Sequence, residues 1–123
     1  MKVLIAALAL VVAACGGDTP APPLTGPPPP PGSGTRVVAK LTDFRIELSR
    51  RSFTAGTYTF VAKNEGKVTH ALMIDRAGGT DNIQPGASAE LSVTLPAGKY
   101  RLYCPVGTHK ALGMAMEINV GEN

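Results

Sequence analysis

Residues 98–116 read GKYRLYCPVGTHKALGMAM, and this stretch decides the interpretation of the whole chain. A thiol, an imidazole and a thioether follow one another at five-residue steps, at Cys104, His109 and Met114. The residues before Cys104 and after Met114 alternate between apolar and polar side chains, which is the period of a β-strand. Because Gly107 and Gly113 help the connection to turn, we expect a β-hairpin that brings the three side chains to one point.

Short alternating segments of the same kind fill most of the sequence upstream. With the hairpin included, the segments cover residues 37–41, 44–48, 57–62, 68–74, 91–95, 100–104 and 114–120. The parity of the apolar positions changes near Thr42 and Asp43, which predicts a bulge or bend there. About seven to eight short strands at this spacing, without a long helical period, predict an all-β sandwich or barrel.

The side chains of the hairpin loop have the chemistry of copper ligands. Soft sulfur ligands favour Cu(I), and imidazole binds both oxidation states, so the mixture at Cys104, His109 and Met114 suits an ion that cycles between them. The fourth ligand is expected to be His70, because the chain has only two histidines. By its parity His70 should face inward, beside Val68 and Leu72.

Other interpretations of these side chains are less consistent with the pattern. A lone cysteine, histidine or methionine is most often a packing residue, but here all of them fall in one arrangement. Zinc prefers cysteine and histidine and binds methionine poorly, and a two-copper centre needs a second cysteine in the loop. The sequence therefore predicts one mononuclear copper ion, bound by His70, Cys104 and His109 with Met114 as a weak axial ligand. Met116 shares the parity of Met114 but lies about 7 Å further along the strand, so we expect it to pack in the core.

From Asp43 to Val120 the chain resembles the cupredoxin (blue copper, plastocyanin/azurin-like) family. The matching residues are Asp43-Phe44, Ala55-Gly56, Asn64-x-Gly66, His70, Gly98 to Pro105, His109 and Met114. The resemblance implies a Greek-key β-sandwich or barrel with copper near one end, and electron transfer as the usual role. One departure is Ala71, because many members have at that position an asparagine that braces the ligand loop. We therefore expect the bracing of the ligand loop to be weaker here, or to be supplied differently.

The N-terminal part is typical of an exported protein. Residues 1–14 are interpreted as a signal peptide, because Lys2 precedes an apolar run of 12 residues that is too short to span a bilayer. The run ends at Cys15 in a pattern that resembles the bacterial lipobox, so Cys15 is expected to carry a lipid anchor. The alternative is an ordinary secretory signal followed by a chance cysteine. Residues 15–35 are rich in proline and are expected to form a semi-rigid spacer, and residues 36–123 to form the copper domain.

The favoured function is that of a membrane-anchored electron carrier of the bacterial cell envelope, outside the cytoplasm. Four protein ligands leave no open position for a substrate, so we do not expect an enzyme. The alternatives are a copper scavenger or chaperone lipoprotein and a metal-free structural lipoprotein. A net charge of +3 from scattered basic residues gives little support for nucleic-acid binding.

We expect a monomer that meets redox partners through an apolar patch around His109. The patch consists of Pro105, Val106, Ala111 and Leu112, and an apolar loop surface of this kind suggests protein docking. Lys110 adds a positive charge beside the patch.

Overall fold

The computed structural model describes residues 27–122. The predicted signal peptide, Cys15 and the first part of the predicted spacer lie outside the described residues. The described part contains nine β-strands: β1 (Thr35–Thr42), β2 (Arg45–Leu48), β3 (Phe53–Thr54), β4 (Gly56–Asn64), β5 (Met73–Ile74), β6 (Gly78–Gly79), β7 (Ser88–Leu95), β8 (Gly98–Tyr103) and β9 (Ala115–Gly121). Within residues 27–122 no helix has the length and apolar character needed to cross a bilayer.

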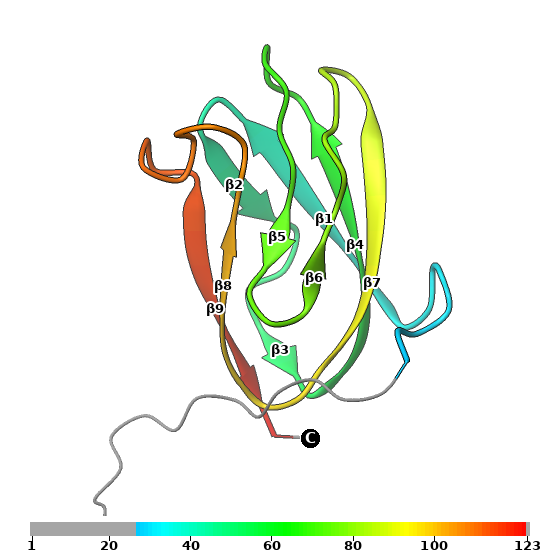
Figure 1. The fold of residues 1–123 in the computed structure, drawn as a ribbon. Helices are drawn as coiled ribbons and strands as arrows, with labels where there is room; N and C mark the ends of the chain where they lie inside the picture. The colour runs from blue at the N-terminus through cyan, green and yellow to red at the C-terminus, as the bar shows by residue number, and fades with distance from the viewer. Residues whose placement is uncertain (1–26, 123) are drawn as a thin grey trace, which may run out of the picture.

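The strands form two sheets that pack against each other (Figure 1). One sheet has the order β2-β1-β4-β7, and the other has the order β3-β9-β8-β5-β6. β1 runs parallel to β4 and β3 runs parallel to β9, whereas the remaining pairs are antiparallel. The chain passes repeatedly from one sheet to the other, so the predicted all-β Greek-key sandwich is confirmed.

The core lies between the sheets and follows the two-residue period of the sequence. Its largest buried members are Phe60 on β4 and Tyr100 on β8. The Tyr100 hydroxyl donates a hydrogen bond to the Pro96 carbonyl at 2.6 Å, and burial raises the pKa of this phenol. On β4 the hydroxyl of Thr59 donates to the carbonyl of Ser33 at 2.7 Å. The last residues of the predicted spacer therefore contact the domain.

The expected bulge or bend near Thr42 and Asp43 is a tight hairpin turn. β1 ends at Thr42, β2 begins at Arg45, and these two residues pair across the turn. A change of parity shows only that successive apolar residues no longer share one face of a continuous strand. It does not distinguish a bulge from a chain reversal, which is why the sequence pattern was misread here.

Of the alternate residues in 68–74 that were expected to face inward, only those from His70 onward do so. His70, Leu72 and Ile74 are buried, but Val68 is 40% exposed, so its predicted inward position is wrong. The sequence pattern failed because residues 65–72 cross from one sheet to the other and do not form a long strand. Within this crossing His70 forms an isolated bridge with Ile83.

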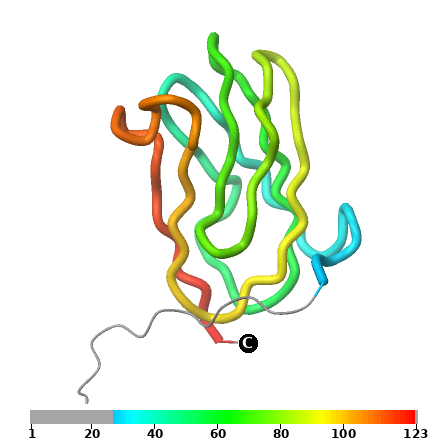
Figure 2. The backbone as a smooth tube through the Cα atoms, in the orientation of Figure 1, coloured from blue at the N-terminus to red at the C-terminus, as the bar shows by residue number. Residues whose placement is uncertain are grey.

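Three connections meet at one end of the sandwich. They are the β1–β2 turn, the crossing segment between β4 and β5, and the β8–β9 loop, which appear in cyan, green and orange at the upper end of Figure 2. Residues 27–34 precede the other end of β1, which is 8 residues long and so spans about 25 Å. The fold thus separates these three connections from the point where the described chain begins.

Candidate metal centre

Cys104 directly follows β8 and is fully buried. Its backbone N–H donates to the carbonyl of Met114 at 3.1 Å, so the pairing of β8 and β9 continues up to the thiol. The alternation of Tyr100 and Leu102 on β8 turns the Cys104 side chain toward the core, as the sequence predicts.

His109 lies in the loop between these two strands and is half-buried. Backbone hydrogen bonds fix the loop around it, because the His109 N–H donates to the Val106 carbonyl and the Met114 N–H donates to the His109 carbonyl, both at 3.1 Å. Gly107 and Gly113 have φ values of 49° and 107°, which favour glycine. The tightly turned loop holds the Nδ1 atom of His109 3.5 Å from the Cys104 sulfur.

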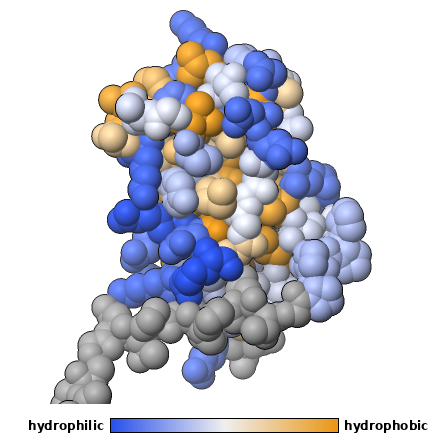
Figure 3. Space-filling view, in the orientation of Figure 1, coloured by the Kyte–Doolittle hydropathy of each residue, from blue (hydrophilic) through white to orange (hydrophobic). Residues whose placement is uncertain are grey.

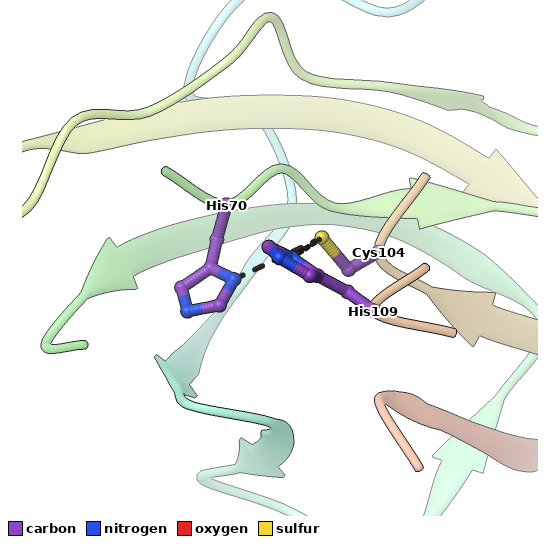
Figure 4. A group of neighbouring side chains, drawn as sticks. All are labelled: His70, Cys104 and His109. Atoms are coloured by element: carbon purple, nitrogen blue, oxygen red, sulfur yellow. Dashed lines mark hydrogen bonds between the residues drawn. The ribbon is translucent and has the colours of Figure 1, made fainter. Parts of the chain in front are cut away.

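His70 comes from the crossing segment and is fully buried. Two backbone hydrogen bonds tie it to Ile83, at 3.1 and 2.7 Å. Its Nδ1 atom lies 3.9 Å from the Cys104 sulfur, and Figure 4 shows both imidazole rings turned toward that sulfur. One ligand atom from each of His70, Cys104 and His109 lies within 4.8 Å of the others, so the structure brings together three of the four predicted ligands.

The two methionines of the hairpin have different positions. Met114 is fully buried, and its backbone bonds to both Cys104 and His109. Met116 is only partly buried and lines a groove of about 570 Å³ between β2 and β9, together with Ile46. This placement favours Met114 as the axial ligand, which stays a prediction.

The crossing segment is held by Asn64, at the end of β4. Its buried side-chain amide donates to the carbonyls of Val68 and Ile83, at 2.9 and 2.8 Å. Its side-chain oxygen accepts a hydrogen bond from the Gly66 N–H at 2.9 Å. Asn64 therefore ties the part of the crossing segment that precedes His70 to Ile83, the bridge partner of His70.

Two residues of the β1–β2 turn also contact the cluster. Asp43 places one carboxylate oxygen 2.7 Å from Nε2 of His70 and accepts a hydrogen bond from the Lys67 N–H at 2.9 Å. The bond from Lys67 is the main cause that lowers the pKa of the Asp43 carboxyl, and His70 also lowers it. The Phe44 ring packs against His109 and His70, with centroid distances of 4.8 and 6.1 Å.

Sequence reasoning did not assign a role to Asp43 or Phe44. Both belong to a dipeptide that matches the cupredoxin resemblance, and this was the signal that pointed to them. Ala71 lacks the bracing side chain of many cupredoxins, and in this structure Asp43 contacts His70 instead.

The donor set fits one copper ion. Nitrogen and sulfur ligands at about 2.0 and 2.3 Å from one ion lie about 3.5–3.7 Å apart at angles between tetrahedral and trigonal. The corresponding separations from the Cys104 sulfur are 3.5 Å to His109 and 3.9 Å to His70. A thiolate and two imidazoles are the trigonal ligands of mononuclear copper sites that have a weak axial methionine.

Comparison with known proteins supports the fold. No protein-family model matches the sequence, and no curated protein matches it. Dithionite-reduced auracyanin from the photosynthetic bacterium Roseiflexus castenholzii is similar in structure, with a TM-score of 0.58 and 21% identity over 73% of this chain and 99% of the auracyanin. Auracyanin B has a TM-score of 0.63 and 14% identity over 79% of this chain and 92% of its own.

A third similar structure is that of Lac15, from a marine microbial metagenome. It has a TM-score of 0.53 and 15% identity over 73% of this chain and 33% of the longer Lac15 chain. Auracyanin is a blue copper cupredoxin. This chain therefore has the cupredoxin fold, and its largely buried His-Cys-His cluster has the donor set of a mononuclear copper centre.

Replacement of Asn64 by alanine should destabilise the copper-free protein by about 2–3 kcal/mol, because it removes the three hydrogen bonds of a buried side chain. Urea unfolding followed by circular dichroism measures the loss. The control is Asn119→Ala, at an exposed position of β9, which should change stability by less than about 0.5 kcal/mol. Equal losses in the two variants would contradict the role given to Asn64.

Replacement of Met114 by leucine should leave copper bound and raise the reduction potential, because the axial ligand tunes the potential of such a site. The matched variant Met116→Leu, in the groove, should leave the potential almost unchanged. Voltammetry of both proteins measures the shifts. A large shift confined to Met116→Leu would exchange the roles of the two methionines.

Proposed function

We propose that this protein is an electron carrier of the bacterial cell envelope that holds one copper ion with His70, Cys104, His109 and Met114. The observation that carries the proposal is the largely buried cluster of one thiol and two imidazoles, which two connections at one end of the sandwich bring together. Bound copper would supply one-electron chemistry by cycling between Cu(II) and Cu(I).

In this function the protein would hold the ligands in fixed positions and shield them from water. Cys104 and His70 are fully buried, so water has little access to them. Backbone bonds from Cys104 to Met114 and from His70 to Ile83 hold both ligands on paired backbone segments. Fixed ligands lower the reorganisation that accompanies a change of charge. Four protein ligands leave no position for a substrate, which supports a carrier in preference to an enzyme.

Exposed apolar residues support a docking surface at the end of the sandwich that holds the ligand cluster. Within the described residues the exposed large hydrophobic side chains are Leu112, which is 57% exposed, and Val68. Leu112 lies on the loop that carries His109, and Val68 lies on the segment that carries His70. Figure 3 shows hydrophobic residues at the upper end of the molecule, over these connections. A docking surface with so few exposed apolar side chains would give small, transient contacts with a partner protein, which suit an electron shuttle.

We propose that electrons enter and leave through the half-buried ring of His109, because the other three proposed ligands are fully buried. Val106, which was predicted in the patch, is partly buried and packs against the core, whereas Pro105 and Ala111 are exposed. The ammonium group of Lys110 lies 4.4 Å from the Tyr103 ring centroid. It therefore places a positive charge beside the patch that would attract an acidic partner.

The lipid anchor on Cys15 and the envelope location complete the proposal. Both rest on the sequence pattern at the N-terminus, which lies outside the described residues. The structure is compatible with a tether, because β1 begins at the end of the sandwich away from the ligand loops. An anchored protein of this shape would keep its docking end free to meet partners.

Cys104→Ser should abolish the intense visible absorption of the copper-loaded protein and its redox response while the β-sandwich remains folded. The reason is that the thiolate, and not the packing of the small side chain, is responsible for the absorption band. Absorption spectra of both proteins with one equivalent of Cu(II), together with circular dichroism, measure the effect. A colourless wild-type protein that binds only Cu(I) would favour the copper scavenger or chaperone, and a wild type without copper affinity would favour the structural lipoprotein.

Leu112→Asp should slow electron exchange between oxidised and reduced copies of the protein about tenfold, because the new carboxylate would lose its hydration in the apolar contact when two patches meet. The copper spectrum should stay unchanged. Line broadening in NMR spectra of mixed oxidation states measures the rate. The control Asn119→Asp introduces the same charge on β9, away from the patch, and should exchange at nearly the wild-type rate. Equal rates for all three proteins would place the electron route elsewhere.

A further inference from the structure

The contact between Asp43 and His70 joins two distant parts of the chain. Asp43 lies in the turn between β1 and β2, and His70 lies in the crossing segment between β4 and β5. The carboxylate is 2.7 Å from Nε2 of His70, and it is 25% exposed whereas the imidazole is fully buried. A hydrogen bond to a charged group in such a sheltered place is stronger than one at the open surface.

Both carboxylate oxygens of Asp43 act as acceptors. One accepts from the Lys67 N–H, so the other faces His70. An ionised carboxylate has no proton to donate. The Nε2 atom of His70 must therefore carry a proton, and in the neutral imidazole its Nδ1 atom then presents a lone pair. Nδ1 is also the atom turned toward the sulfur of Cys104.

Gly66 leaves the space that this contact needs. A Cβ atom at Gly66 would overlap both the Asp43 carboxylate oxygen and Nε2 of His70. The backbone conformation of Gly66 is one that other residues also adopt, because its φ lies outside the left-handed region. The close approach of the carboxylate and the imidazole, and not the shape of the turn, therefore explains glycine at this position.

We propose that Asp43 is a positioning residue of the metal centre, which holds His70 in the tautomer and orientation that offer Nδ1 to the metal and which favours the oxidised ion by its negative charge. A carboxylate behind a metal-bound histidine orients the ring and raises its basicity. Asp43 thus braces His70 from the β1–β2 turn, whereas Ala71, the next residue after His70, has no polar side chain.

The charge of Asp43 acts differently on the two oxidation states. A Cu(II) ion with one thiolate and two neutral imidazoles has a net positive charge, and the Cu(I) form has none. A nearby carboxylate stabilises the positive form by direct attraction. The effect on the potential rests on the proposed copper function, whereas the effect on the tautomer of His70 does not.

The first test uses the copper-free protein. Nitrogen-15 NMR of the His70 ring at neutral pH should show the Nε2–H tautomer in the wild type. In Asp43→Asn the side-chain oxygen should remain on the Lys67 N–H and the amide NH₂ should face Nε2, so the Nδ1–H tautomer should predominate. A wild-type ring with its proton on Nδ1, or the same tautomer in both proteins, would overturn the proposal.

The second test uses copper. Asp43→Asn should weaken Cu(II) binding about 10–100-fold and weaken Cu(I) binding less, so the potential should rise. Each tenfold difference between the two affinities raises the potential by about 59 mV for a one-electron couple. The control Glu65→Gln removes an equal charge from an exposed residue whose carboxylate faces Lys40, and its potential should change little. An equal rise of the reduction potential in both variants would show that any lost negative charge has this effect, and it would overturn the proposal.

Gly66→Ala provides an independent variant in case Asp43→Asn fails to fold. It keeps the charge of Asp43 but pushes the carboxylate and the imidazole apart. It should lose the preference for the Nε2–H tautomer and bind Cu(II) at least tenfold more weakly than the wild type. A folded Gly66→Ala protein with wild-type affinity and tautomer would contradict the proposal. If the wild type binds no copper, the proposed function fails and the NMR test still decides the role of Asp43.

Discussion

The pairing of β8 with β9, closed by the hydrogen bond from Cys104 to the Met114 carbonyl, is the constraint on which the metal centre depends. Because this pairing is antiparallel, it brings together the two ends of a loop only nine residues long, from Pro105 to Gly113. The loop then has little freedom, and His109 is held over the sulfur by its own backbone bonds. The hairpin alone supplies three of the four predicted ligands.

The fourth predicted ligand needs the rest of the sandwich. His70 is a buried polar side chain, and such a group is costly unless its hydrogen-bonding atoms are satisfied. The structure supports His70 from three places: Ile83 bonds to its backbone, Asn64 holds the segment before it, and Asp43 contacts its ring. A fully satisfied network of this kind makes one arrangement of the crossing segment much more stable than its alternatives.

The two ends of the sandwich differ in what they present. One end carries the largely buried ligand cluster and the exposed side chains of Leu112 and Val68. Toward the other end the chain enters the domain, and Ser33 bonds to Thr59 on the outer face of β4. An electron carrier needs a fixed metal centre close to the surface where its partners dock. In this fold the centre and that surface share one end, and the N-terminal residues enter the domain toward the other end.

The sequence by itself determined the strand period, the all-β sandwich and the candidate ligands, because these depend on local alternation and on the scarcity of histidine and cysteine. It also placed the hairpin loop correctly, since both strands lie next to it in the chain. It could not show that the parity change near Asp43 is a chain reversal or that Val68 is exposed, because parity carries no information about direction or crossing. Only the tertiary structure decided that Asp43 contacts His70. That contact joins residues 27 positions apart, and it depends on how two connections from different sheets pack together.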